Sequence, residues 1–296
     1  MSFRKDKLHA LLDQRSSQSE NLSDAFKEHL EKGIHGIAFS AYEEGQEPGD
    51  QITEEQIRRR MQILEPNLKW IRSFSCTDGN EMIPVIAKEF GIKTLVGAWL
   101  SDDEELNQRE MTSLVELAHK GYVDIAAVGN EVLYRKEMEE EQLLSCISWV
   151  KHQIGEIPVA YVDAYYEFEN RPKITDICDI ILANCYPFWE GCHADYALLY
   201  MKDMYRRAVK AGNGKKVIIS ECGWPSAGQN HHGAIPSKEN AMNYFINTQN
   251  WSREESIDVF YFSSFDEAWK IGDEGDVGAY WGLYDKNENL KYQDYE

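Results

Sequence analysis

Eight short apolar segments alternate with longer amphipathic segments along this chain, and this alternation constrains its fold more than any other feature. The short segments are rich in β-branched residues, whereas the longer ones carry apolar residues at helical spacing. Strands that alternate with helices in this way are typical of βαβ units and a parallel sheet. We therefore expect strands at residues 34–40, 70–74, 94–99, 123–128, 158–162, 180–184, 217–220 and 259–263.

Capping signals support the helices between these strands. Thr53 and Gln56 have the spacing of a capping box, and Ser101 and Glu104 repeat that spacing ahead of another helix. Gly121 follows the second of these helices, where glycine commonly ends a helix. The helices are thus predicted by their ends as well as by their apolar faces.

Eight parallel strands can close into a barrel or remain an open, doubly wound sheet. A dinucleotide-binding sheet would place a GxGxxG loop after its first strand, and residues 35–40 offer no such loop. We predict an α/β fold, a single-domain (β/α)8 TIM barrel over residues 33–296. Residues 1–32 are expected to form a polar leader and a helix that closes the lower end of the barrel.

The charge of the chain limits its partners. Its 31 Lys and Arg stand against 51 Asp and Glu, which gives a formal net charge of −20. Nucleic-acid binding needs a cationic surface, and an acidic polysaccharide would be repelled, so a neutral substrate is expected. No apolar run approaches the length of a membrane span, and we expect neither a nucleic-acid nor a membrane partner. The oligomeric state stays open.

The six cysteines lack the CxxC or CxxH spacing of a metal site. We interpret them as reduced thiols of a cytoplasmic protein, because disulfides are rare in the cytosol. The first twenty residues are charged and polar, which agrees with a cytoplasmic location, although a chain from which a signal had been removed would look the same. His231 and His232 are adjacent but lack third and fourth ligands, so we predict no metal and no cofactor.

In a barrel of this kind the active site lies where the strands end. Glu131 follows the strand expected at 123–128, and Glu221 follows the strand expected at 217–220. A single loop glutamate is commonly a solvated side chain, but two carboxylates that face one cavity are what cleavage of a glycosidic bond requires. The other polar and aromatic residues at strand ends include Tyr42, Asn130, Asp163, Tyr165, Tyr186, Phe265, Glu267 and Lys270.

Three segments carry a resemblance to a known family. Residues 128–132 (VGNEV), 219–226 (ISECGWPS) and 265–270 (FDEAWK) occur in this order at the fourth, seventh and eighth expected strands. Together they resemble the signature segments of glycoside hydrolase family 17, which contains β-1,3-glucanases, lichenases and fungal cell-wall β-1,3-glucan transglycosylases. The likeness extends weakly from about Gly36 to Tyr284.

The resemblance implies a retaining double displacement on β-1,3-linked glucan or gluco-oligosaccharides. Glu131 matches the family's acid/base and Glu221 its nucleophile. We expect hydrogen bonds from Tyr186 and Asn130 to support an ionised Glu221. Burial and the neighbouring negative charge should raise the pKa of Glu131.

Several other residues have both a functional and a structural interpretation. Trp224 could form the floor of the sugar site or support its loop, and we favour support. Glu267 and Lys270 match charged residues of the family's sugar subsite, and an ion pair at the barrel rim explains them equally. For Tyr186, a place beside the nucleophile and packing in the core are equally favoured. A sugar-binding wall is slightly favoured over simple cover of apolar strand ends for Tyr42, Asp163 and Tyr165.

Within catalysis, hydrolysis of short β-glucan oligosaccharides is our first prediction, and transglycosylation is the alternative. A non-catalytic glucan-binding barrel is a further alternative. Such a barrel arises when a hydrolase scaffold loses its acid or its nucleophile. Both Glu131 and Glu221 are present within intact motifs here, which favours catalysis.

Overall fold

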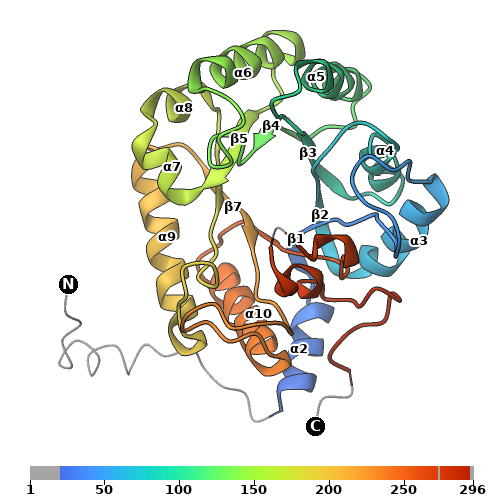
Figure 1. The fold of residues 1–296 in the computed structure, drawn as a ribbon, viewed down its shortest axis with the longest axis vertical. Helices are drawn as coiled ribbons and strands as arrows, with labels where there is room; N and C mark the ends of the chain where they lie inside the picture. Colours follow the sequence, from blue (N-terminus) through green and yellow to red (C-terminus); the bar gives the residue numbers. More distant parts are fainter. Residues whose placement is uncertain (1–20, 273, 294–296) are drawn as a thin grey trace.

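In the computed structural model, which describes residues 21–272 and 274–293, eight parallel strands close into a barrel (Figure 1). Each strand pairs with its neighbour in sequence, and β1 pairs with β8 to close the ring. The predicted (β/α)8 barrel is confirmed, with strand ends within two residues of those expected. The strands are β1 (Ile34–Ala38), β2 (Leu68–Ser73), β3 (Lys93–Ala98), β4 (Ile125–Asn130), β5 (Val159–Ala164), β6 (Ile181–Asn184), β7 (Val217–Cys222) and β8 (Val259–Tyr261).

Helices surround the barrel as an outer ring (Figure 1). They are α2 (Leu22–Glu31), α3 (Glu54–Leu64), α4 (Met82–Glu89), α5 (Glu104–His119), α6 (Glu140–Ile154), α7 (Tyr165–Asn170), α8 (Pro172–Ile177), α9 (Ala197–Ala211) and α10 (Lys238–Glu254). Short 3-10 turns add η1 (Glu65–Asn67), η2 (Ala194–Tyr196), η3 (Ala268–Lys270) and η4 (Asp276–Tyr280).

The helix expected before the first strand is α2, and it lies beside α10 rather than across the lower end of the barrel (Figure 1). Phe26 of α2 packs against Phe245 of α10, with ring centroids 4.9 Å apart. Among the described residues β8 is followed only by the 3-10 turns η3 and η4. The place beside α10 is therefore filled by the helix that precedes β1. Residues 1–20 of the expected leader lie outside the described residues.

The predicted caps are partly correct. Thr53 and Gln56 form the capping box of α3, as expected. The cap predicted at Ser101 is wrong, because α5 begins two residues later and Asp103 accepts hydrogen bonds from its first turn. Ser101 instead accepts a bond from the backbone N–H of Asp103 and so orients the true cap. A carboxylate at this position is also favoured by the helix dipole.

The hydrophobic core has two parts, as a barrel requires. Inward side chains fill the barrel itself, and a larger layer lies between the strands and the helices. Gly36 packs closely against this inner layer, and a side chain is excluded there because a Cβ would lie 2.6 Å from the Phe260 ring. The inner layer consists of Leu95, Ile125, Ala127, Ala160, Val162, Leu182, Ile218 and Phe260.

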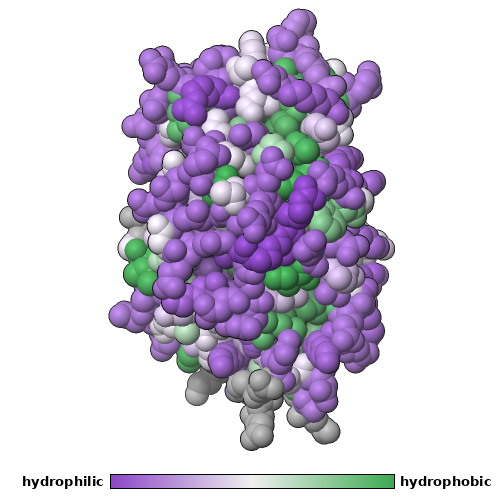
Figure 2. Space-filling model, turned by 90° about the vertical axis from the view of Figure 1, so that its right-hand side faces the viewer, coloured by the Kyte–Doolittle hydropathy of each residue, from purple (hydrophilic) through white to green (hydrophobic). Residues whose placement is uncertain are grey.

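The outer surface is mainly hydrophilic, with scattered apolar residues, on the face shown in Figure 2. No helix within residues 21–272 and 274–293 is long and apolar enough to cross a bilayer. All six cysteines, which fall within the described ranges, are free thiols.

The side chains that fill the barrel should contribute strongly to its stability. Leu182 is fully buried there, so Leu182→Ala should lower the free energy of unfolding by about 2–5 kcal/mol through lost burial and the cavity left behind. Val209→Ala, at an exposed position of α9, should change it by less than about 0.5 kcal/mol. Urea unfolding measures both, and equal effects would contradict the assignment of this core.

Candidate active site

A cavity of about 390 Å³ opens at the carboxyl ends of the strands, and both candidate carboxylates line it. Such a position is where barrel enzymes carry their chemistry. The cavity is also strongly aromatic. Its lining residues are Glu131, Tyr134, Ala164, Tyr165, Tyr166, Asn184, Tyr186, Trp189, Glu190, Glu221, Phe262, Glu274 and Trp281.

Glu221, on β7, has hydrogen bonds to both carboxylate oxygens. Arg72 of β2 donates to Oε1 at 2.5 Å, and the hydroxyl of Tyr186 donates to Oε2 at 2.7 Å. Burial, followed by the charge of Glu221, holds the pKa of the Tyr186 phenol well above its ordinary value, so the hydroxyl keeps its proton. The predicted bond from Tyr186 is confirmed, and Glu221 is fixed from two sides.

The predicted bond from Asn130 to Glu221 is wrong. The Asn130 side chain instead accepts a bond from Arg72 through Oδ1, at 2.6 Å. Arg72 thus reaches between the two carboxylate-bearing strands, and it also donates to the backbone carbonyl of Ser220 at 3.0 Å. Asn130 therefore helps to orient the guanidinium group that holds Glu221.

Glu131 follows β4, at an irregular stretch of the sheet. The register with β5 shifts between Ala127 and Asn130, and Glu131 itself has a φ of 53°. A left-handed backbone is uncommon for a residue with a side chain and is often found at functional sites. The backbone N–H of Glu131 donates to the carbonyl of Val162 at 2.8 Å, which holds this conformation.

The surroundings of Glu131 favour its neutral form. Burial, followed by the charge of Glu221, raises the pKa of Glu131 to about 7. A bond of 2.8 Å from the Asn184 amide to Oε1 acts in the opposite direction and is weaker. Asn184 in turn accepts from Ser220 at 2.8 Å, so its amide nitrogen points toward Glu131. The raised pKa agrees with the sequence-based expectation.

Sequence reasoning missed Arg72, which is 1% exposed. Its guanidinium carbon lies 4.3 Å from the centroid of the Phe74 ring. The signal was present, because Arg72 is a charged residue inside an apolar strand, Trp70 to Phe74. A buried charge of this kind needs a partner of opposite charge. The ion pair of Arg72 with a strand-end glutamate, either Glu131 or Glu221, could therefore have been predicted from the sequence.

The walls of the cavity come largely from loops. Tyr165, predicted for a sugar-binding wall, is among the lining residues, but it is 3% exposed and its hydroxyl donates to Glu190 at 2.9 Å. Trp189 and Trp281 form an aromatic pair with ring centroids 5.6 Å apart, and Tyr186 meets Trp281 edge-on at 5.4 Å. Trp189 and Glu190 were not predicted. They follow the Tyr186-Pro187 segment, but loop residues carry no periodic signal that would place them.

Three predicted contact residues belong to the barrel wall rather than to the cavity. Asp163 is fully buried and accepts bonds from the Tyr161 hydroxyl and the Ala164 backbone. Trp224 is buried and donates from Nε1 to the carbonyl of Ile235 at 3.0 Å, so it supports a loop as favoured. Phe265 is fully buried as well. None of these three lines the cavity.

Glu267, Lys270 and Tyr42 are not among the residues that line the cavity. Lys270 forms a buried ion pair with Glu267 at 2.8 Å, which matches the rim ion pair considered from the sequence. The ammonium group also lies 4.1 Å from the centroid of the Phe262 ring, and Phe262 lines the cavity. Tyr42 meets Trp269 edge-on at 6.0 Å.

No group of three or more metal-ligating side chains occurs within residues 21–272 and 274–293. The adjacent His231 and His232 instead pack within an aromatic loop, where His231 lies edge-on to Trp189 with ring centroids 5.7 Å apart.

Comparison with known proteins places the chain in a family. The model of the BtgE/BtgC glycoside hydrolase domain matches residues 36–282, which include strands β2 to β8, most of β1 and both carboxylates. The chain belongs to this family. It is therefore a glycoside hydrolase, similar to β-1,3-glucanases.

Relatives of this glycoside hydrolase include curated fungal proteins. A glucan 1,3-beta-glucosidase of Schizosaccharomyces pombe is 26% identical over 250 residues, which cover 78% of each chain. A probable glucan endo-1,3-beta-glucosidase of Aspergillus fumigatus is 28% identical over 277 residues, covering 81% of this chain and 39% of the relative. The likeness to the first extends over most of both proteins.

Solved structures of glycoside hydrolases are also similar to this chain. A glycoside hydrolase family 17 beta-1,3-glucanosyltransferase of Rhizomucor miehei aligns with a TM-score of 0.79 and 29% identity, covering 88% of this glycoside hydrolase and 96% of the solved chain. An active-site mutant of the Rhizomucor enzyme was solved in complex with laminaritriose and aligns equally well.

The pKa of Glu131 should depend on the charge of Glu221. Glu221→Gln removes a negative charge that opposes ionisation, so the pKa of Glu131 should fall below about 7. It should stay above the ordinary glutamate value, because burial is the larger cause and remains. NMR titration of carboxyl-labelled glutamate measures this, with Glu116→Gln on the exposed face of α5 as the control. An unchanged pKa would show that the two carboxylates are not coupled.

Proposed function

We propose that this enzyme is a member of glycoside hydrolase family 17 that hydrolyses β-1,3-linked glucan or gluco-oligosaccharides with retention of configuration. One observation carries the proposal: two carboxylates of unequal character line a single aromatic cavity. Glu221 is ion-paired with Arg72, whereas the pKa of Glu131 is raised to about 7. The family named for the Rhizomucor structure, and the glucan named for the curated relatives, support the assignment.

The first step uses both carboxylates. Glu131, protonated below pH 7, donates its proton to the departing glycosidic oxygen, while Glu221 attacks the anomeric carbon. The C–O bond to the leaving sugar breaks as a bond from Glu221 to the anomeric carbon forms. Arg72 and Tyr186 hold the attacking carboxylate in place, which limits the motion needed to reach the transition state.

The second step reverses the role of Glu131. Formation of the glycosyl ester consumes the negative charge of Glu221, and that charge is one cause of the raised pKa of Glu131. The pKa of Glu131 falls accordingly, so its carboxylate can take a proton from the incoming water. Water attacks the anomeric carbon, Glu221 leaves as a carboxylate, and the product keeps the β configuration.

A neutral glucan suits the walls of the cavity. Among the lining aromatic residues Trp189 and Tyr166 are half-buried and Tyr134 is exposed, so their rings can contact the apolar faces of sugar rings. Asn130 uses Oδ1 to accept from Arg72, which leaves its amide nitrogen to donate to a sugar hydroxyl. The net charge of −20 would repel a polyanionic glycan.

Transglycosylation is the second candidate function, and two observations favour it. The Rhizomucor relative is named as a β-1,3-glucanosyltransferase, and the half-buried ring of Trp189 in the cavity lining would suit an acceptor sugar as well as a leaving one. Hydrolysis and transfer share the glycosyl-enzyme and differ only in whether water or a sugar hydroxyl resolves it.

We also propose that the protein acts in the cytoplasm on short oligosaccharides. The six free cysteines support this location, because disulfides are common in secreted proteins. Immunodetection in separated cell fractions would test it, and recovery outside the cells would overturn the proposal.

Laminari-oligosaccharides of defined length test the function directly. Shorter products formed first as the β-anomer, followed by NMR, are expected from retaining hydrolysis, and additional longer products would assign transglycosylation. Glu221→Ala should abolish turnover, and azide should restore turnover of an activated substrate with inverted product. Glu116→Ala serves as the control. Binding without any turnover by the unmutated protein would instead identify a non-catalytic glucan-binding barrel.

The pH dependence of activity should report Glu131. A general acid must be protonated, so kcat/KM should fall about tenfold per pH unit above about 7, where Glu131 loses its proton. Glu131→Ala should remove this alkaline limb for an activated substrate whose leaving group needs no proton. If the limb persists in that variant, another group provides the acid.

A further inference from the structure

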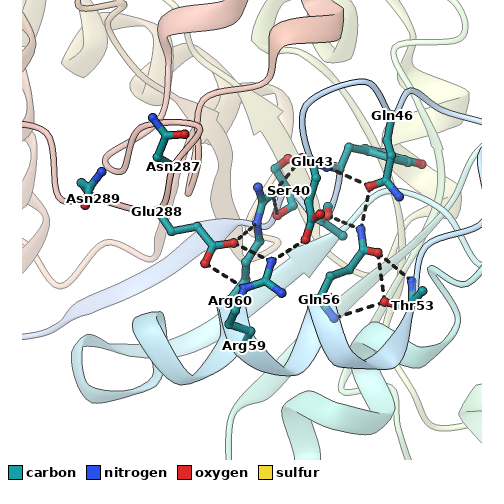
Figure 3. A network of polar contacts seen from close by, with 12 residues as sticks. Ser40, Glu43, Gln46, Thr53, Gln56, Arg59, Arg60, Asn287, Glu288 and Asn289 are labelled. Atoms are coloured by element: carbon teal, nitrogen blue, oxygen red, sulfur yellow. Dashed lines mark hydrogen bonds and ion pairs between the residues drawn. The ribbon is translucent and has the colours of Figure 1, made fainter.

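A polar network at the rim of the barrel joins segments that are far apart in the sequence (Figure 3). Arg60 of α3 is 1% exposed, and its guanidinium group donates to the backbone carbonyls of Ser40 at 3.1 Å and Tyr42 at 2.8 Å. It also donates from Nε to Glu288, near the carboxyl end of the chain, at 3.1 Å. The loop after β1 comprises residues 39–53. Arg60 thus holds the first residues of this loop through their backbone carbonyls.

Glu288 orients the arginines of this network (Figure 3). Its carboxylate accepts from Arg59 at 2.8 and 2.9 Å as well as from Arg60. Arg59 also pairs with Glu43 of the loop after β1. The backbone of Glu288 is left-handed, with a φ of 68°, a conformation that is uncommon for a residue with a side chain. The Glu288 carboxylate therefore orients Arg59 and Arg60 of α3, and these two arginines in turn contact the loop after β1.

The loop held in this way presents Tyr42. The Tyr42 hydroxyl accepts a bond of 3.2 Å from Asn80, in the loop after β2, and its ring meets Trp269, in the segment after β8. Trp269 neighbours Lys270, whose ammonium group lies over the Phe262 ring of the cavity wall. Three strand-end loops therefore meet at Tyr42, beside the cavity rather than within it.

We propose that Arg60 and Glu288 are positioning residues for a sugar-binding surface formed by Tyr42 and Trp269. Neither positioning residue lines the cavity, so each acts by holding the loop after β1 in place. The inference rests on the proposed function, since it assumes a neutral β-glucan as the substrate. It implies that the carboxyl-terminal segment sets the affinity for oligosaccharides long enough to extend past the cavity.

Glu288→Gln tests the proposal with little change of shape. It removes the charge that orders two arginines, so the loop should lose its fixed position. KM for laminarihexaose should rise roughly fivefold with kcat unchanged, while KM for the shortest oligosaccharide that is cleaved should not change. A fall in kcat for every substrate, or no change in KM for any, would overturn the proposal.

A matched control lies on the same helix. Arg58 of α3 pairs with Glu89 of α4 at 2.6 Å, so Glu89→Gln removes an ion pair of the same type that does not involve the loop after β1. This variant should match the unmutated enzyme with both substrates. An effect of Glu89→Gln equal to that of Glu288→Gln would mean that any weakened α3 contact raises KM, and would contradict a specific role.

A double-mutant cycle identifies the residue through which Glu288 acts. Tyr42→Ala should itself raise KM for laminarihexaose, and Glu288→Gln should then add little to it, because both changes disable the same surface. If the two effects on KM multiply, Glu288 acts elsewhere and the proposal fails.

Hydrogen exchange decides the question even without a substrate. Amides in residues 40–52 should exchange several-fold faster in Glu288→Gln than in the unmutated protein or in Glu89→Gln, because the loop opens locally more often. If the unmutated protein turns over no glucan, the proposed function fails while this comparison still tests the positioning role. Equal exchange in all three proteins would remove that role.

Discussion

Arg72 crosses the mouth of the barrel from β2 to reach Glu221 on β7, and both side chains are almost completely withdrawn from water. Two charges buried in this way are costly unless they pair closely and their remaining polar groups are hydrogen-bonded. Here Arg72 also bonds to Ser220 and Asn130, and the second oxygen of Glu221 accepts from Tyr186. The ion pair thus depends on four strand-end positions at once, and it fixes their mutual arrangement.

This pair also explains why two glutamates in one cavity differ. Arg72 compensates the charge of Glu221 directly, whereas Glu131 receives a single amide bond from Asn184 and is buried beside that charge. The pKa of Glu131 is raised because its environment offers little to stabilise a second negative charge. The ion pair with Arg72 on one carboxylate and the burial of the other make the two glutamates unequal, as the proposed roles of nucleophile and acid require.

The barrel and its two carboxylates could be predicted because both follow from local patterns. Alternating strands and helices give the fold, and Glu131 and Glu221 directly follow apolar strands whose ends must meet at one rim. The bond expected from Asn130 to Glu221 was wrong because Arg72 lies between them, a contact across the barrel that no sequence spacing encodes. The helix cap at Asp103 was missed for a local reason, since Ser101 has an equally good capping side chain.

The walls of the cavity were harder to predict, and the reason bears on function. The carboxylates are held by strands, whose geometry the barrel dictates, whereas Trp189 and Trp281 lie in loops, whose course depends on tertiary packing. In the proposed mechanism water and a sugar hydroxyl attack the same anomeric carbon, so the choice between hydrolysis and transfer would rest with these loops. In that mechanism the strand-end carboxylates would form the glycosyl-enzyme, and the loops would determine which molecule resolves it.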